Sequence, residues 1–203
     1  MAGAGNEPRA LARSLLDLCR SRKMMIATAE SCTGGLVAAA LTEIPGSSAV
    51  VDRGFVTYSN DAKHKMLGVS IDTLETFGAV SKETAMAMAV GALEAADADL
   101  AVSITGIAGP GGATPGKPVG LVHFAAAARD GRIVAREFRF GAVGRSNVRQ
   151  RSVLEALKLL MELARGPAKA AVKRPGAAPG RSRLRAPRTP RRSAGTRRRT
   201  SRP

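Results

Sequence analysis

The chain is poor in the residues that build metal centres and disulfide frameworks. Its 203 residues include two histidines and two cysteines, with no Cys-x-x-Cys spacing. Cys19 and Cys32 therefore predict no secreted disulfide scaffold. His64 and His123 lie far apart in the sequence, which argues against a histidine-rich metal site and leaves few candidates for a Ser-His-Asp triad. We expect no metal.

Long apolar runs are also missing. A membrane span needs about 18 consecutive apolar residues, and no stretch of the chain approaches this length. The N-terminus carries no apolar segment of the kind found in secretory signals. These absences predict a cytoplasmic protein without membrane contact.

Acidic residues are absent from residues 166–203. This segment holds two lysines and 11 arginines, so it carries 13 of the chain's 16 net positive charges. Six of the 11 prolines lie here, and Val172 and Leu184 are its only larger aliphatic residues. It cannot bury enough apolar surface to offset the entropy of ordering, so we predict a disordered Arg/Pro-rich tail. Without interleaved aromatic residues, any nucleic-acid contact of this tail is expected to be non-specific.

The remaining residues, 1–165, are close to neutral and long enough for one domain with its own core. Apolar spacing predicts helices over 8–22, 34–43, 60–67, 81–96 and 145–165, with Met86, Val90 and Leu93 facing the core. Short apolar runs predict strands at 24–28, at 50–58 with a break near 52–54, and at 100–106, 119–127 and 132–140. The last two strands are joined by a hairpin at Asp130-Gly131. This order indicates an α/β protein, a three-layer α/β/α sandwich with a mixed sheet.

Residues 28–35, Thr-Ala-Glu-Ser-Cys-Thr-Gly-Gly, form the most informative segment. They connect a predicted strand to a predicted helix, and Gly34 and Gly35 let backbone N–H groups approach a ligand. This arrangement suits a nucleophilic Ser31 with an oxyanion site at the helix N-terminus. Serine before a helix also serves as an N-cap, which is the alternative interpretation. Cys32 is either a rival nucleophile or a buried structural cysteine.

Polar residues follow two further predicted strand ends and open one helix. Ligands in open α/β sheets bind at the carboxyl ends of strands, so we expect 58–63 and Thr105-Gly106 to line one crevice with Ser31. Lys63 is either a solvated lysine or, if burial lowers its pKa, the base that a serine nucleophile requires. Asn60 or Asp61 is expected to cap the helix that carries Lys63.

Arg145 opens the last predicted helix. A cation complements the dipole poorly at a helix N-terminus. Arg145 is therefore either a surface arginine or the ligand of an anion such as phosphate.

Residues 111–118 nearly match the phosphate-binding pattern G-x-x-x-x-G-K-[ST]. Pro118 stands at the last position, and a strand rather than a helix is predicted to follow. We therefore reject nucleoside triphosphate hydrolysis and interpret 106–118 as a glycine-rich connecting loop, whose N–H groups can still reach a ligand.

Five separated motifs, in the same order, resemble the CinA C-terminal domain family over about residues 8–164. They are 28–35, 45–48, 54–60 with Lys63, 78–81, and 105–111 with 117–120. Stand-alone members of this family are nicotinamide-nucleotide amidases. The resemblance therefore implies deamidation of nicotinamide mononucleotide to nicotinate mononucleotide and ammonia in pyridine nucleotide salvage, by a homo-oligomer that needs no cofactor.

The resemblance also implies roles for single residues. Ser31 attacks the carboxamide, Lys63 takes its proton, and Tyr58 orients this pair. The implied substrate-binding residues are Glu30, Thr33, Gly34, Gly35, Asn60, Thr105, Gly106, Gly109 and Arg145. Among them, the N–H groups of Thr33, Gly34 and Gly35 hold the oxyanion, and Arg145 holds the 5′-phosphate.

One departure from the family pattern bears on substrate preference. The family usually carries Gly-Asp-Arg before the last helix, whereas this chain has Gly-Ala-Val-Gly-Arg at 141–145. Two alternatives to the implied activity remain: an amidase for a related nucleotide amide, and a competence- or damage-related protein that contacts nucleic acid through its basic tail.

Overall fold

A computed structural model describes residues 6–166 of the chain. The predicted disorder of the basic tail falls on residues outside this range. The elements, in chain order, are α1 (Asn6–Ser21), β1 (Ile26–Glu30), α2 (Leu36–Thr42), the 3-10 helix η1 (Ser47–Ala49), β2 (Val51–Val56), α3 (Asn60–Leu67), α4 (Ile71–Phe77), α5 (Lys82–Ala95), β3 (Leu100–Gly106), β4 (Leu121–Ala128), β5 (Ile133–Arg139) and α6 (Arg145–Arg165).

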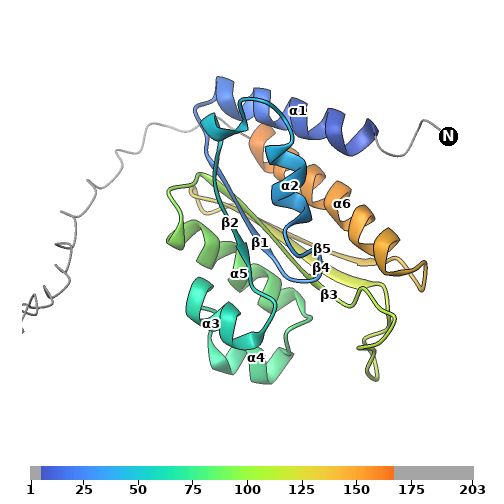
Figure 1. Ribbon diagram of the computed structural model, residues 1–203. Helices are drawn as coiled ribbons and strands as arrows, with labels where there is room; N and C mark the ends of the chain where they lie inside the picture. The colour runs from blue at the N-terminus through green and yellow to red at the C-terminus, as the bar shows by residue number, and fades with distance from the viewer. Residues whose placement is uncertain (1–5, 167–203) are drawn as a thin grey trace, which may run out of the picture. The chain divides into compact units, whose positions relative to one another are not determined.

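The five strands form one mixed sheet in the order β2-β1-β3-β4-β5. β2, β1 and β3 run parallel, whereas β4 and β5 are antiparallel to their neighbours. Helices α1, α2 and α6 cover one face, and α5 covers the other with α3 and α4 packed against it (Figure 1). The predicted three-layer α/β/α sandwich with a mixed sheet is confirmed.

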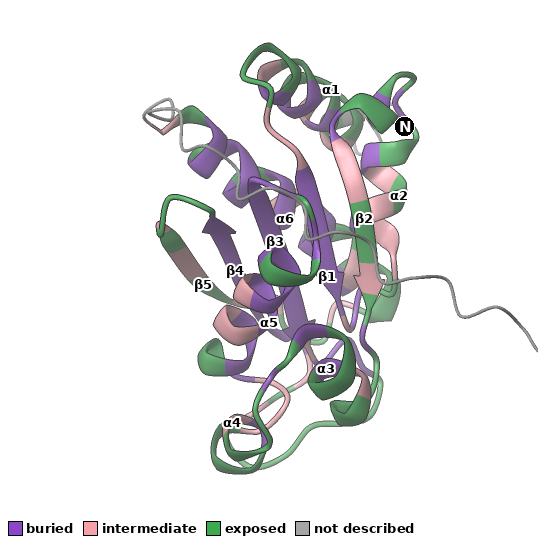
Figure 2. Ribbon diagram, turned by 90° about the vertical axis from the view of Figure 1, so that its left-hand side faces the viewer, coloured by how far each residue is buried: buried purple, intermediate pink, exposed green. Residues whose placement is uncertain are grey.

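The central strands are buried on both faces, and the edge strands β2 and β5 are more exposed (Figure 2). Larger aliphatic residues pack toward α1, α2 and α6, whereas alanines dominate the face under α5. Small side chains there let α5 lie close to the sheet. The core prediction for α5 was therefore only partly right: Leu93 is buried, but Met86 and Val90 are half-buried, and Met88 is the large side chain that is fully buried.

A glycine in the middle of α5 fixes the position of α3. A Cβ at Gly91 would collide with the Leu67 carbonyl at the end of α3, so only glycine permits this close approach. The contact matters because α3 carries Lys63.

Local chemistry accounts for the differences from the predicted elements. Helix α4 was not predicted, although Ser70 caps it by accepting a hydrogen bond from the Thr73 amide at 3.0 Å. The predicted break near 52–54 corresponds to an irregularity within one continuous strand, because the register of β2 against β1 shifts between Val51 and Arg53. Gly54 then pairs with Thr28 and leaves room for the Thr28 hydroxyl. Ser59 caps α3, rather than Asn60 or Asp61.

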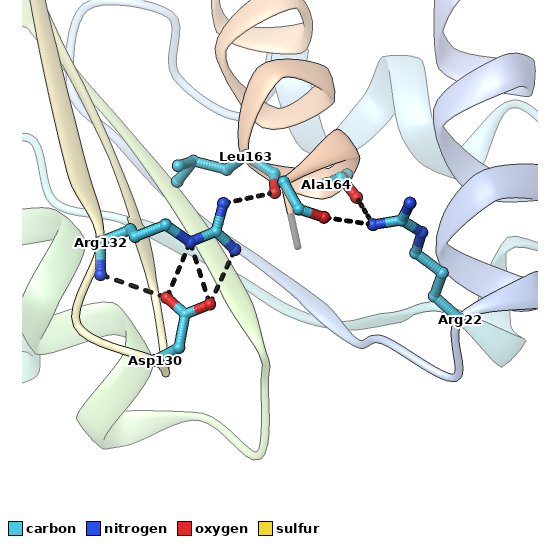
Figure 3. Close-up of polar contacts among 6 residues, drawn as sticks. Arg22, Asp130, Arg132, Leu163 and Ala164 are labelled. Atoms are coloured by element: carbon cyan, nitrogen blue, oxygen red, sulfur yellow. Dashed lines mark hydrogen bonds and ion pairs between the residues drawn. The ribbon is translucent and has the colours of Figure 1, made fainter. Parts of the chain in front are cut away.

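Two arginines hold the C-terminal end of α6. Arg22 donates to the carbonyls of Ala164 and Gly166 at 2.6 and 2.7 Å, and Arg132 donates to the Leu163 carbonyl at 3.1 Å (Figure 3). The last carbonyls of a helix lack the usual i+4 amide donors, so the arginines add hydrogen bonds to them, at Leu163 beside one from the Gly166 amide at 3.1 Å, and complement the helix dipole. None of the described helices is long and apolar enough to cross a membrane.

Candidate active site

Ser31 and Lys63 meet at the carboxyl end of the parallel strands. Ser31 directly follows β1, and its amide donates to the Ile104 carbonyl of β3 at 2.9 Å. Lys63 lies on α3, which follows the neighbouring strand β2. Its Nζ lies 3.2 Å from the Ser31 Oγ and donates to the Thr57 carbonyl at 2.8 Å. Lys63 is only 1% exposed, so of the two alternatives for this residue the buried lysine is the one that the structure has.

Burial controls the charge of Lys63. Desolvation lowers the pKa of its amine from the ordinary 10.5, and the nearby Cys32 thiol opposes this shift. Among the ion pairs of residues 6–166, none involves Lys63. A neutral amine in this position can accept the Ser31 proton while one of its own N–H groups remains bonded to the Thr57 carbonyl. This geometry is that of a serine nucleophile with its base.

The rival groups do not fit. Cys32 is 5% exposed, and burial raises the pKa of its thiol to about 12, so it stays protonated and unreactive near neutral pH. His64 contacts the Val69 carbonyl through Nδ1 at 2.9 Å, and His123 lies 3.8 Å from Glu137. Neither histidine of the chain is hydrogen-bonded to Ser31, so the geometry contains no Ser-His pair.

Glu30, and not Ser31, caps helix α2. One carboxylate oxygen of Glu30 accepts from the amides of Gly35 and Val37 at 2.9 and 3.1 Å, and the other accepts from Ala38 at 2.8 Å. The N-cap residue Gly35 makes no side-chain cap, so the Ser31 hydroxyl is left to Lys63. Glu30 is fully buried. We therefore correct its expected role from substrate contact to a support for the Ser31 turn.

The expected oxyanion donors are reduced from three to one. The Gly34 amide donates to the Ser31 carbonyl at 3.0 Å, and the Gly35 amide donates to Glu30. Within residues 6–166 no hydrogen bond uses the Thr33 amide. The Thr33 hydroxyl is also buried without a partner. The Thr33 amide is thus the one of the three expected donors without a hydrogen-bond partner in the described part of the chain, in a residue that is 0% exposed.

Arg145 lies at the start of α6 and joins two other segments. It donates to the Gly109 carbonyl at 3.0 Å and to the Tyr58 hydroxyl at 2.8 Å. Tyr58 is 60% exposed and, contrary to expectation, contacts Arg145 rather than the Ser31–Lys63 pair. Both partners of Arg145 are neutral, and none of the described ion pairs includes it, so its charge is available to an anion.

Three other residues were predicted to bind substrate, and their surroundings in the structure differ from one to the next. Thr105 is 1% exposed and donates to the Ala79 carbonyl, so its hydroxyl is occupied in the core rather than free in a crevice. Gly106 ends β3, where a Cβ would lie 2.7 Å from the Leu121 carbonyl. Only glycine fits at this position, because a side chain would collide with the neighbouring strand. Asn60 is exposed in the first turn of α3.

Arg149 was missed by the sequence analysis. Its guanidinium donates through Nη2 to the Thr33 carbonyl at 2.8 Å, inside the Ser31 turn. Its spacing of four residues from Arg145 was the available signal, since positions i and i+4 share one face of a helix. The Thr57 carbonyl was missed as well, and a backbone acceptor leaves no such signal.

Other parts of residues 6–166 offer less chemistry. No group of three or more His, Cys, Asp and Glu side chains there could hold a metal ion. A hollow of about 890 Å³ between α1, α2 and α6 is lined mainly by aliphatic residues such as Leu36 and Val153. It contains no nucleophile beside a base, so the Ser31–Lys63 pair remains the candidate active site.

Comparisons with known proteins identify the family of the chain. The CinA C-terminal domain model matches residues 8–164. A protein of Enterobacter agglomerans named nicotinamide-nucleotide amidohydrolase PncC is 55% identical over 121 residues, which are 60% of this chain and 74% of that protein. A putative competence-damage inducible protein of Caldicellulosiruptor saccharolyticus is 46% identical over 77% of this chain but only 38% of its own length.

Solved structures show the same fold. The competence/damage inducible protein CihA of Agrobacterium tumefaciens is 55% identical with a TM-score of 0.78, covering 80% of this chain and 99% of that one. A CinA-superfamily protein of Klebsiella pneumoniae is 37% identical with a TM-score of 0.73, covering 77% and 97%.

Proposed function

Because the chain belongs to the CinA C-terminal domain family, we propose that it is a nicotinamide-nucleotide amidase. Its reaction converts nicotinamide mononucleotide to nicotinate mononucleotide and ammonia. The observation that carries this proposal is the buried Ser31–Lys63 pair, with Oγ and Nζ 3.2 Å apart. The similarity to a protein named for this activity supports the substrate class.

The first half of the reaction forms an acyl-enzyme. Neutral Lys63 accepts the Ser31 proton as Oγ attacks the carboxamide carbon. The tetrahedral intermediate then breaks its C–N bond, and Lys63 returns the proton to the departing ammonia. The Thr57 carbonyl keeps Nζ in place throughout, because it accepts a hydrogen bond that does not involve the transferred proton.

The second half hydrolyses the ester. A water molecule gives a proton to Lys63 and attacks the acyl carbon, after which Ser31 leaves with the proton and the nicotinate carboxylate is released. In both halves the Thr33 amide is the proposed donor to the oxyanion. One such donor is worth about 10²–10³ in turnover.

Arg145 is the proposed phosphate ligand. Its two hydrogen-bond partners, Tyr58 and the Gly109 carbonyl, are neutral and give way readily to a dianion. The family's acidic residue before this arginine is missing here, so no carboxylate at 142–144 competes with the phosphate. We also propose that the reaction belongs to pyridine nucleotide salvage in the cytoplasm and that the enzyme is a homo-oligomer.

The experiment is an ammonia assay with nicotinamide mononucleotide. We expect Ser31→Ala and Lys63→Met to abolish turnover, because they remove the nucleophile and its base. Cys32→Ala is the matched control, since it alters the neighbouring residue and leaves the reacting groups in place. Full activity of Ser31→Ala, or loss of activity in Cys32→Ala alone, would overturn the assignment. Nicotinamide riboside, which lacks the phosphate, tests the substrate class.

A second candidate function, nucleic-acid contact, is favoured by the charge of residues 166–203. We propose this segment as a part of the chain separate from the amidase domain at 1–165. The test is salt-dependent retention of the full chain on double-stranded DNA, with a chain ending at Gly166 as the comparison. Equal retention of both chains would remove this function.

A further inference from the structure

One peptide unit beside Ser31 is held from both sides. It joins Thr33 to Gly34. Its N–H donates to the Ser31 carbonyl at 3.0 Å, and its C=O accepts from Arg149 Nη2 at 2.8 Å. The same carbonyl makes only a longer contact with the Leu36 amide, at 3.4 Å. Arg149 is therefore its main partner.

Gly34 makes this arrangement possible. Its φ of +59° lies in the left-handed region that favours glycine. A Cβ at this position would lie 3.5 Å from Arg149 Nη2, so the guanidinium packs directly over the turn. The Gly34 N–H of this peptide is bonded to the Ser31 carbonyl, so the peptide is linked directly to the residue that carries the nucleophilic hydroxyl.

Nothing else in the described structure accounts for Arg149 at this place. It forms no ion pair among residues 6–166, and its Nε is buried without a hydrogen-bond partner. A buried, unpaired donor and an unneutralised charge at a helix N-terminus are both unfavourable. The hydrogen bond to the nucleophile turn is the one interaction that its position provides.

We propose that Arg149 is a positioning residue, which holds Ser31 in its attacking orientation through the Thr33–Gly34 peptide. This inference rests on the proposed amidase function. It separates the two arginines of the first turns of α6: Arg145 binds the substrate phosphate, whereas Arg149 fixes the nucleophile. Misplacement of a reacting atom by about 1 Å costs about 100-fold in rate.

The first measurement separates turnover from binding. Arg149→Met keeps the aliphatic stem but removes the donors, and we expect kcat for nicotinamide mononucleotide to fall about 10- to 100-fold with little change in KM. Arg149→Lys keeps one donor and should recover part of kcat. Arg151→Met is the matched control, because Arg151 is exposed on the same helix and contacts no part of the Ser31 turn. A large rise in KM at constant kcat would make Arg149 a substrate ligand and overturn the proposal, as would unchanged kinetics.

A double-mutant cycle tests the shared peptide. Gly34→Ala strains the same turn, so its effect and that of Arg149→Met should combine to much less than their product. If the double variant loses kcat by the full product of the two single losses, the two substitutions act independently. That result would contradict an effect of both through the same peptide. Melting temperatures of all variants show whether a loss of kcat reflects unfolding, and Arg149→Lys serves if Arg149→Met does not fold.

A second readout is independent of the substrate. A fluorophosphonate probe reacts with activated serines, and intact-mass analysis after digestion follows its attachment to Ser31. We expect Arg149→Met to slow this labelling by the same factor as kcat. If the wild type labels at Ser31 but releases no ammonia from nicotinamide mononucleotide, the proposed substrate is wrong while the labelling ratio still decides the role of Arg149. No labelling of Ser31 in the wild type would overturn both.

Discussion

The two ends of helix α6 use arginine in opposite ways. At the C-terminal end, Arg22 and Arg132 donate hydrogen bonds to carbonyls of the last turn and the C-cap (Figure 3). At the N-terminal end, Arg145 and Arg149 add positive charge where the helix dipole is already positive, and the N-cap Gly144 supplies no side-chain cap. The first arrangement stabilises the helix, whereas the second does not.

This difference teaches how to recognise functional charge. An arginine that completes the local electrostatics needs no ligand to explain it. An arginine that opposes them, and whose hydrogen bonds go only to neutral groups, points to a role outside folding. The N-terminal pair lies beside the Ser31–Lys63 site, and the C-terminal pair lies about 31 Å away along the 21-residue helix.

The largest expected effect is at the N-terminal end. Arg145→Met should raise KM for nicotinamide mononucleotide about 10- to 100-fold, because a charged hydrogen bond to the phosphate contributes about 1.5–3 kcal/mol. The melting temperature should stay the same or rise slightly, since a cation is removed from the positive end of a dipole. Steady-state kinetics and thermal unfolding measure the two effects. A large loss of stability at unchanged KM would break the contrast between the two ends.

The C-terminal end should give the reverse pattern. Arg132→Met removes the hydrogen bond to the Leu163 carbonyl and the ion pair with Asp130, and we expect a loss of about 1 kcal/mol in the free energy of unfolding. Turnover should be unchanged. Denaturant unfolding checks the stability, with Arg136→Met, an exposed arginine paired with Glu162, as the control. Loss of ammonia release with normal stability would contradict this pattern.

The stability of the protein should also depend on the protonation of Lys63, a buried ionisable residue at the candidate site. Its pKa is lowered in the folded protein, so between that value and 10.5 the unfolded chain binds more protons than the folded one. The contribution of Lys63 to stability therefore rises with pH in this window and is lost as pH falls through the folded pKa. Lys63→Met removes this dependence. The melting temperature of the variant, relative to the wild type, should fall as pH increases from 7 toward 10.

The same titration governs the reaction. In the wild type kcat/KM should rise with pH through the lowered pKa of Lys63, because only the neutral amine accepts the Ser31 proton. The inflection in the kinetic profile and the one in the stability difference should coincide. Inflections at clearly different pH values would mean that a group other than Lys63 is the base.

The smallest effect is expected from shortening the chain. Ending it at Gly166 removes only residues that follow α6 in the sequence. Turnover should stay within about twofold of the full chain, as for changes outside the core and the site. A larger loss of kcat would show that the basic segment takes part in the reaction.

Much of the fold could be predicted from local patterns. The bounds of α6 were predicted at 145–165, and the start of β3 at residue 100, because apolar periodicity and the flanking glycines are local signals. Helix α4 was missed, since its seven residues carry a weak apolar pattern and the Ser70 cap went unrecognised. The core prediction for α5 was incomplete, because it included Met86, Val90 and Leu93 but not Met88 and the alanines that are fully buried there.

Some residues of the candidate site could likewise be predicted from local patterns, and others could not. Ser31 and Arg145 stand out by their local setting, a strand–turn–helix and a cation at a helix start. For Glu30, Thr105 and Tyr58 the expected contacts were wrong, because each of these side chains has a partner that no local pattern shows. Arg149 had a spacing signal, but its role depends on a carbonyl that is 116 residues away in sequence.

The sequence by itself determined the order of the elements, the placement of Ser31 on a glycine-containing turn and the family to which the chain belongs. These features depend on neighbouring residues, and short segments contain them. Only the tertiary structure decided that Lys63 is buried against Ser31, that Glu30 rather than Ser31 caps α2, and that two arginines with one helical spacing serve different partners. Burial and hydrogen bonding join segments that only the parallel pairing of β2, β1 and β3 brings together, and these contacts lower the pKa of Lys63 and place its amine beside the Ser31 hydroxyl.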